Sequence, residues 1–97
     1  MNQQTASAID RGTTSRTHVE IRNWMVSYIG HLLGLEQGKV DTTLFFNKIG
    51  LDSMMVIVMT EELGQWLGHD VAPTIAYDYP TIDRFSAYLS EAHRSQP

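Results

Sequence analysis

The sequence predicts an all-α fold: a small bundle of three main helices and one short helix, with a long structured loop between the first two main helices. Apolar residues recur at helical spacing in three segments, and helix-capping residues stand at the ends of those segments. No segment shows the alternation of polar and apolar residues that marks a half-buried strand. A chain of 97 residues is long enough for one domain with a modest core.

The first main helix is predicted to follow Thr17 and to run to about Leu33, where Gly34 stops it. Thr17-His18-Val19-Glu20 matches a capping box, in which the threonine and glutamate side chains each accept a hydrogen bond from the other's backbone N–H. Residues 1–16 and 94–97 are expected to be flexible tails or linker, which leaves residues 17–93 as the domain. The expected buried stripe consists of Ile21, Trp24, Met25, Tyr28, Ile29, Leu32 and Leu33.

The connection over residues 34–52 is long and has no helical period, but it is not polar throughout. It contains Leu44, Phe45, Phe46 and Ile49. We therefore expect it to fold back over the helices, as structured loops of this length often do at functional sites.

The second main helix is predicted from Ser53 to about Leu67. At 100° per residue, one broad face collects Met55, Val56, Met59, Leu63, Trp66 and Leu67. The other side collects Ser53, Met54, Ile57, Val58, Glu61, Gly64 and Gln65. Because a bundle this small cannot easily bury both faces of one helix, the second set predicts an exposed apolar patch beside Ser53, unless the long loop covers it.

The last part of the chain predicts a short helical turn and then a third main helix. Residues 72–78 allow only a short turn of helix, because Pro80 disfavours helix at Tyr79. Thr81 caps the last helix. Its apolar residues are Ile82, Phe85, Tyr88, Leu89 and Ala92.

The stretch Ile49-Gly50-Leu51-Asp52-Ser53-Met54 presents one serine at the start of a helix. Gly50 permits a tight turn, and Asp52 is suited to cap the free amides of a helix that begins at Ser53. Those amides and the helix dipole favour a negative group at Ser53, such as a phosphate ester. The same residues also fit an ordinary helix start without chemistry.

Composition argues against several other classes of protein. The absence of cysteine removes disulfide frameworks and thiol nucleophiles, and the net charge of −4 argues against nucleic acid as a partner. No apolar run has the length of a membrane span, so we expect a cytoplasmic protein. The histidines lack metal-ligand spacing, and Ser53 lacks the following glycine and preceding strand of a hydrolase elbow.

From Thr17 to about Ala92 the chain resembles acyl carrier proteins and the carrier domains of modular polyketide synthases. The resemblance lies in Gly50-Leu51-Asp52-Ser53-Met54 and Tyr77-Asp78-Tyr79-Pro80-Thr81-Ile82. It implies that Ser53 carries a 4′-phosphopantetheine arm, which a phosphopantetheinyl transferase donates from coenzyme A with magnesium. The thiol of that arm holds acyl intermediates as thioesters during polyketide or lipid biosynthesis.

The resemblance also implies roles for neighbouring residues. Asp52 matches the acidic residue that precedes the modified serine, and it is expected to order the attachment site. Val58 stands where glutamate is common in the family, so recognition is expected to use more apolar contact and less charge. The residues expected to meet partner enzymes are Met54, Ile57, Val58 and Glu61.

The implied protein is a monomeric, non-catalytic carrier, and its implied partners are enzymes that load, extend and unload it. These are an acyltransferase or a fatty acyl-AMP ligase, and a ketosynthase or other pathway enzymes. Gln65-Trp66-Leu67-Gly68 and the segment 73–80 are similar to carriers loaded by fatty acyl-AMP ligases. The alternatives are a peptidyl carrier of a nonribosomal synthetase, which usually shows Gly-Gly-His/Asp-Ser, and an unmodified helical interaction domain.

Overall fold

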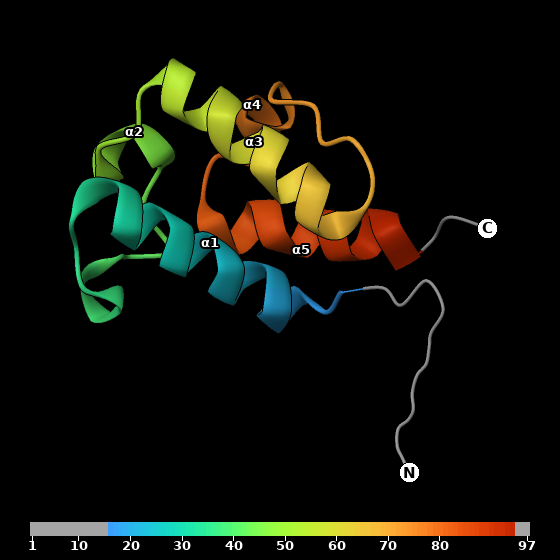
Figure 1. Ribbon diagram of the computed structural model, residues 1–97, viewed down its shortest axis with the longest axis horizontal. Helices are drawn as coiled ribbons and strands as arrows, with labels where there is room; N and C mark the ends of the chain where they lie inside the picture. The colour runs from blue at the N-terminus through green and yellow to red at the C-terminus, as the bar shows by residue number, and fades with distance from the viewer. Residues whose placement is uncertain (1–15, 95–97) are drawn as a thin grey trace, which may run out of the picture.

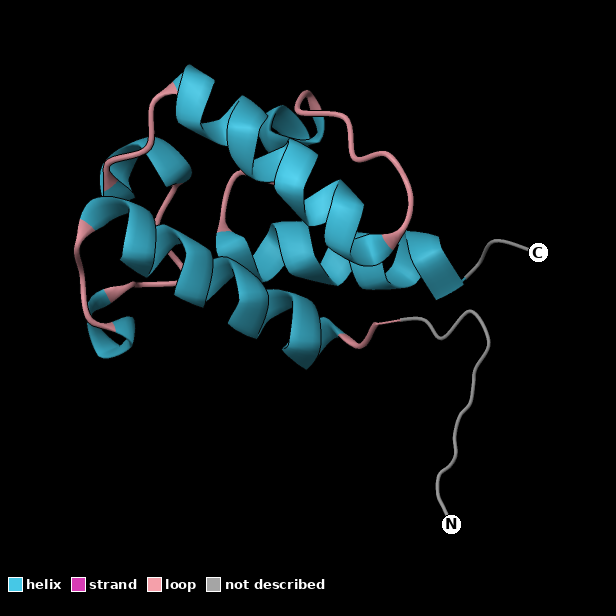
Figure 2. Cartoon of the chain, viewed as in Figure 1, coloured by secondary structure: helices cyan, strands magenta, loops and turns pink. Residues whose placement is uncertain are grey.

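The computed structural model describes residues 16–94, and within them the chain forms three long helices and two short ones (Figure 1). The long helices are α1 (His18–Leu33), α3 (Ser53–Leu67) and α5 (Ile82–Arg94), and the short ones are α2 (Phe46–Ile49) and α4 (Ile75–Asp78). Residues 16–94 contain no β-strand, only one isolated bridge between Phe45 and Thr81 (Figure 2). The predicted all-α class is confirmed. The expected tails lie almost wholly outside the described residues.

The ends of α1 follow the sequence signals closely. The Thr17 hydroxyl accepts a hydrogen bond from the Glu20 amide at 3.1 Å, and the Glu20 carboxylate accepts one from the Thr17 amide at 2.9 Å. At the other end Gly34 adopts a φ of 71°, and the Leu35 amide donates to the Gly30 carbonyl at 2.7 Å. The predicted capping box and glycine stop are therefore both present.

The core lies where the three long helices meet. Figure 1 shows α1 and α5 side by side with α3 beside them, and an ion pair between Arg22 and Asp83, 3.1 Å from Nε to Oδ1, links α1 to α5. Among the described residues, the apolar side chains with no exposed surface are Ile21, Met25, Ile29, Met59, Leu63, Ile82 and Phe85. All seven belong to the predicted apolar stripes, although Leu32 in the last turn of α1 is 42% exposed and does not join them.

The long connection contains two short elements that the sequence did not predict. A 3₁₀ turn spans Gln37–Lys39, and α2 spans Phe46–Ile49. The Phe46 side chain is buried against Phe85, and its amide donates to the Pro80 carbonyl at 2.9 Å. The expectation that this segment folds back over the helices is confirmed, and it places α2 directly before the Ser53 corner.

The short helix α4 lies between α3 and α5 in the chain, and Thr81 directly precedes α5. The Thr81 hydroxyl accepts a hydrogen bond from the Arg84 amide at 3.1 Å, as the predicted cap requires. Among the residues that the structure describes, no helix has both the length and the apolar character needed to cross a bilayer.

Candidate functional site

Three consecutive features of the chain set the position of Ser53. Gly50 turns the backbone with a φ of 125°, a conformation that side-chain-bearing residues rarely adopt. Leu51 is buried with 3% of its surface exposed, which anchors the corner to the core. The Asp52 carboxylate then accepts a hydrogen bond from the Met55 amide at 2.8 Å, so that α3 begins at Ser53 and leaves this serine exposed.

The electrostatics of this corner favour an anion on the Ser53 oxygen. The first backbone amides of a helix have no acceptor within it, and in α3 the Asp52 carboxylate binds one of them, that of Met55. The helix dipole also places partial positive charge at this end. The first turn of α3 contains no acidic side chain, so the neighbouring carboxylate is that of the N-cap Asp52. Asp52 is engaged as the helix cap, so it is not arranged as a base for the Ser53 hydroxyl.

An open groove of about 500 Å³ lies beside Ser53. Its walls come from α2, α3, α4 and the segments joining them, and Asp52 is the one charged residue among them. The groove is lined by Phe45, Phe46, Asn47, Leu51, Asp52, Ser53, Val56, Ile57, Pro73, Thr74, Ala76, Tyr77 and Pro80.

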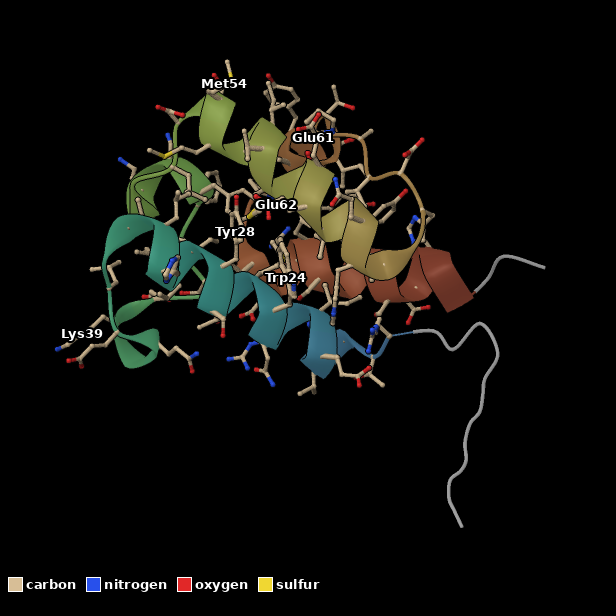
Figure 3. All side chains as sticks on the ribbon, viewed as in Figure 1. Trp24, Tyr28, Lys39, Met54, Glu61 and Glu62 are labelled. Carbon is tan, nitrogen blue, oxygen red and sulfur yellow. The ribbon has the colours of Figure 1, made fainter. Side chains whose placement is uncertain are left out.

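The outer face of α3 carries the predicted apolar patch. Met54, Ile57 and Val58 are 65%, 40% and 39% exposed, and Figure 3 shows Met54 projecting outward near the start of α3. The loop over residues 34–52 therefore leaves this face open. The predicted site residues do not all share one surface, because Ile57 lines the groove with Ser53 whereas Glu61 lies by a separate polar hollow next to Gln65.

Two exposed aromatic residues of the groove were missed by the sequence analysis. Phe45 is 55% exposed and Tyr77 is 81% exposed, and both line the groove with Ser53. Helical periodicity gives no signal for these two residues, because both belong to four-residue elements. Phe45 precedes α2, and Tyr77 lies within α4. The described residues contain no group of three His, Cys, Asp or Glu side chains that could hold a metal ion.

Comparison with known proteins identifies the family to which this chain belongs. A sequence profile described as "Phosphopantetheine attachment site" matches residues 23–89, a span that includes the Ser53 corner, the groove and most of α5. The chain belongs to the phosphopantetheine attachment-site family. Domains of this family carry 4′-phosphopantetheine covalently, and the chemistry of an exposed hydroxyl at a helix start suits a phosphodiester.

Individual relatives support the assignment. One phenolphthiocerol/phthiocerol polyketide synthase polypeptide of Mycobacterium tuberculosis is 31% identical over 71 residues, which are 73% of this chain and 4% of that protein. The chain thus spans only a small part of the length of such relatives. The acyl carrier protein LipD of Actinoplanes friuliensis is 32% identical, with a TM-score of 0.69 over 94% of this chain and 100% of LipD.

A free-standing peptidyl carrier protein from Acinetobacter baumannii has a TM-score of 0.73 over 78% of this chain and 95% of its own. Its identity of 22% shows a shared fold alone. The phosphopantetheine-binding carrier domain described above is therefore homologous to carrier domains of polyketide synthases, and its fold is common to acyl and peptidyl carriers.

Proposed function

We propose that this chain is an acyl carrier that holds acyl intermediates as thioesters on a 4′-phosphopantetheine arm attached to Ser53, during polyketide or lipid biosynthesis in the cytoplasm. The observation that carries the proposal is the exposed Ser53 at the capped start of α3, within the span that matches the family. The domain extends over residues 17–93. The chain itself performs no catalysis, and its partners act on the arm.

The residues around Ser53 support attachment of the arm. The α3 amides favour the charge of a phosphodiester on the Ser53 oxygen, and Asp52 orders the corner by capping the helix. The arm also supplies the thiol that this cysteine-free chain lacks. Ser53 is thus a group that another enzyme modifies.

The outer face of α3 supports docking by partner enzymes. We assign this role to Met54, Ile57, Val58 and Glu61, all of which are exposed. The partners are a phosphopantetheinyl transferase, a loading enzyme and a ketosynthase or other pathway enzyme. A small interface of this kind suits a carrier that must leave each partner quickly.

The sequence around the site favours two finer assignments. Gly50-Leu51-Asp52-Ser53 differs from the Gly-Gly-His/Asp-Ser of peptidyl carriers, which favours acyl over peptidyl cargo. The segments 65–68 and 73–80 favour a fatty acyl-AMP ligase as the loading enzyme. The matching test is acylation of the modified carrier by such a ligase with a fatty acid and ATP, compared with loading by an aminoacyl-adenylating domain.

Modification of Ser53 is tested by incubating the protein with coenzyme A, magnesium and a broad-specificity phosphopantetheinyl transferase, followed by intact-mass measurement. Wild type is expected to gain one phosphopantetheinyl group. Ser53→Ala is expected to gain none. Ser27→Ala removes the hydroxyl of an exposed serine on a different helix, α1, and is expected to gain one group as wild type does. An unmodified wild type beside a modified control carrier would favour the helical interaction domain instead.

A further inference from the structure

A stack of three aromatic rings joins α1 to α3. The Trp24 ring stacks on Tyr28 of the same helix with centroids 5.0 Å apart, and on Trp66 of α3 at 5.8 Å. At the α3 end of the stack, the Arg16 guanidinium lies 4.4 Å from the centre of the Trp66 ring, within the range of a cation–π interaction. The chain therefore places a guanidinium group of its own against one end of this stack.

The opposite end of the stack opens into a hollow. Trp24 and Tyr28 line this hollow, which has a volume of about 690 Å³ and lies between α1, α3 and the 3₁₀ turn over Gln37–Lys39. Its outer wall is fixed, because the side-chain amide of Gln37 donates a hydrogen bond to the Ser27 hydroxyl at 2.7 Å. The hollow shares no lining residue with the groove beside Ser53. It is therefore a separate surface of the domain.

The lining of this hollow is acidic. Glu36 and Glu62 both line it, and its lining contains no lysine or arginine. The Tyr28 hydroxyl donates a hydrogen bond to the Glu62 carboxylate at 3.2 Å, which holds that charge beside the aromatic ring in the seam between α1 and α3 (Figure 3). Neither glutamate forms an ion pair with another described residue. Among the residues that the structure describes, this end of the stack thus has two carboxylates and no cation.

Arginine is the side chain that best complements this arrangement. Its planar guanidinium group stacks on an aromatic ring and donates two parallel hydrogen bonds to a carboxylate, which lysine cannot do. Its aliphatic stem can cover the Leu35 side chain, which lines the hollow and is 38% exposed. A free small cation would gain little in so open a site, so the arginine must belong to a polypeptide that also contacts the rim.

We propose that this hollow binds an arginine side chain of a partner polypeptide, with the guanidinium group against Tyr28 and paired with Glu62. Glu62 follows Ser53 by nine residues, which at 100° per residue places it on the opposite side of α3, about 13.5 Å further along the axis. A polypeptide held here leaves Ser53 open to a second enzyme. The hollow therefore suits a tether that keeps the carrier in place while other enzymes act on its arm. The binding site goes beyond the proposed function, and only its use as a tether rests on that function.

The probe is an acetylated and amidated peptide with arginine between two leucines and one glycine at each end. Tryptophan fluorescence reports binding, because both tryptophans of the chain belong to the stack. At about pH 8, where histidine is ordinarily neutral, the unmodified carrier is expected to bind the peptide with a Kd on the order of 1 mM. A peptide with citrulline, which keeps the shape of arginine but lacks its charge, is expected to bind about 5-fold more weakly.

Variants with the same change of charge test the position of the site. Glu62→Gln keeps an acceptor for the Tyr28 hydroxyl and is expected to raise the Kd about 5-fold. Glu36→Gln, which lies outside the helices, is expected to raise the Kd about 3-fold. Asp78→Asn is the matched control, because Asp78 is exposed on α4 and does not line the hollow, and its Kd should stay within about 1.5-fold of wild type. Circular dichroism shows whether each variant is folded.

Three outcomes would overturn the site. Equal Kd values for Glu62→Gln, Glu36→Gln and Asp78→Asn would show that the hollow does not hold the arginine. Free arginine that binds as tightly as the peptide would assign the hollow to a small cation instead of a polypeptide. Concentration-dependent dimers of the carrier alone, abolished by Glu62→Gln, would assign it to a second copy of this chain.

Transfer of the arm separates this inference from the proposed function. The rate of phosphopantetheinyl transfer to Ser53 should be unchanged when the peptide saturates the hollow, and inhibition would contradict a surface separate from Ser53. An unmodified wild type that still binds the peptide would instead overturn the carrier function and leave the arginine site standing.

Discussion

At the scale of single residues, the residues before Ser53 each have a separate structural role. Gly50 provides the turn, Leu51 the anchor in the core and Asp52 the helix cap, so Ser53 is left with no structural duty. Each of the first three residues meets a different physical requirement. The proposed modification of the Ser53 hydroxyl would therefore leave the cap, the turn and the core contact of this corner in place.

The cap at Asp52 predicts a difference between two substitutions. Asp52→Ala removes the acceptor of the Met55 amide and is expected to lower the free energy of unfolding by about 1 kcal/mol. Asp52→Asn keeps an acceptor at the same place and is expected to lower the free energy of unfolding by only about 0.3 kcal/mol. Urea denaturation of both variants measures the difference. Equal losses would mean that the charge of Asp52 matters more than its hydrogen bond.

Tyr28 predicts a stability difference at alkaline pH. Burial, and then its hydrogen bond to Glu62 at 3.2 Å and the charge of that carboxylate, raise the pKa of Tyr28 above its ordinary value of 10.0. Figure 3 shows the two side chains in the seam between α1 and α3. Because the folded-state pKa is raised, this contribution is present below about pH 10 and is lost as the pH rises through the folded value.

Tyr28→Phe keeps the ring that stacks on Trp24 at 5.0 Å but cannot ionise. At about pH 8 it should be less stable than wild type by at most about 1 kcal/mol, the value of an exposed hydrogen bond. At about pH 11 the difference should shrink or reverse, since the other tyrosines titrate in both proteins. Denaturation midpoints of both proteins at the two pH values measure this stability difference. An equal difference at both pH values would contradict the raised pKa of Tyr28.

At the scale of elements, α1 and α3 end in the same way. Each has a glycine in its last turn and a second glycine with positive φ just after its end, Gly30 and Gly34 for α1 and Gly64 and Gly68 for α3. The amide after each pair bonds back to the carbonyl of the first glycine, at 2.7 Å for Leu35 and 3.1 Å for His69. Both glycine pairs therefore mark helix ends at which the backbone packs closely.

The prediction from the helical wheel that Gly64 lies on the outer side of α3 is wrong. It is buried because the chain after α3 folds back over it, so that a Cβ atom there would lie 2.8 Å from the His69 carbonyl oxygen. Gly64→Ala is therefore expected to destabilise the domain by about 1 to 3 kcal/mol. The control is Gly38→Ala, where a Cβ atom meets nothing within 4 Å, and its free energy of unfolding should change little. Thermal denaturation compares them.

The long helices could be predicted from sequence because each displays several turns of apolar period between recognisable caps. That is why the bounds of α1 and α3, and the exposed positions of Met54, Ile57 and Val58, agree with the structure. One-turn elements have no period to display. The position of α2 depends on Phe46 packing against Phe85, a contact across the fold, and the exposure of Tyr77 depends on which side of α4 faces the core.

At the scale of the whole molecule, the Ser53 corner lies away from the end of the last described helix. Figure 1 shows the end of α5 on one side of the bundle and the start of α3 on the other. The Arg16 guanidinium lies 4.4 Å from the centre of the Trp66 ring, which ties the start of the domain to the far end of α3. Of the described elements, those around Ser53 are α2, α3 and α4, whereas residue 16 lies beside Trp66.

The last prediction concerns the choice of partner, which belongs to the surface as a whole. Val58 is 39% exposed on the outer face of α3, so Val58→Glu should change the free energy of unfolding by no more than about 0.5 kcal/mol. It should nevertheless weaken docking to an apolar partner surface, because the new carboxylate must lose water there, and strengthen docking to a basic one. The measurement is kcat/KM with two phosphopantetheinyl transferases, one with a basic and one with an apolar carrier-binding surface. Val58→Glu should shift the preference toward the basic enzyme, and the size control Val58→Gln should not, which would show that charge on this face selects the partner. Unfolding of Val58→Glu would instead place Val58 in the core and remove it from the docking surface.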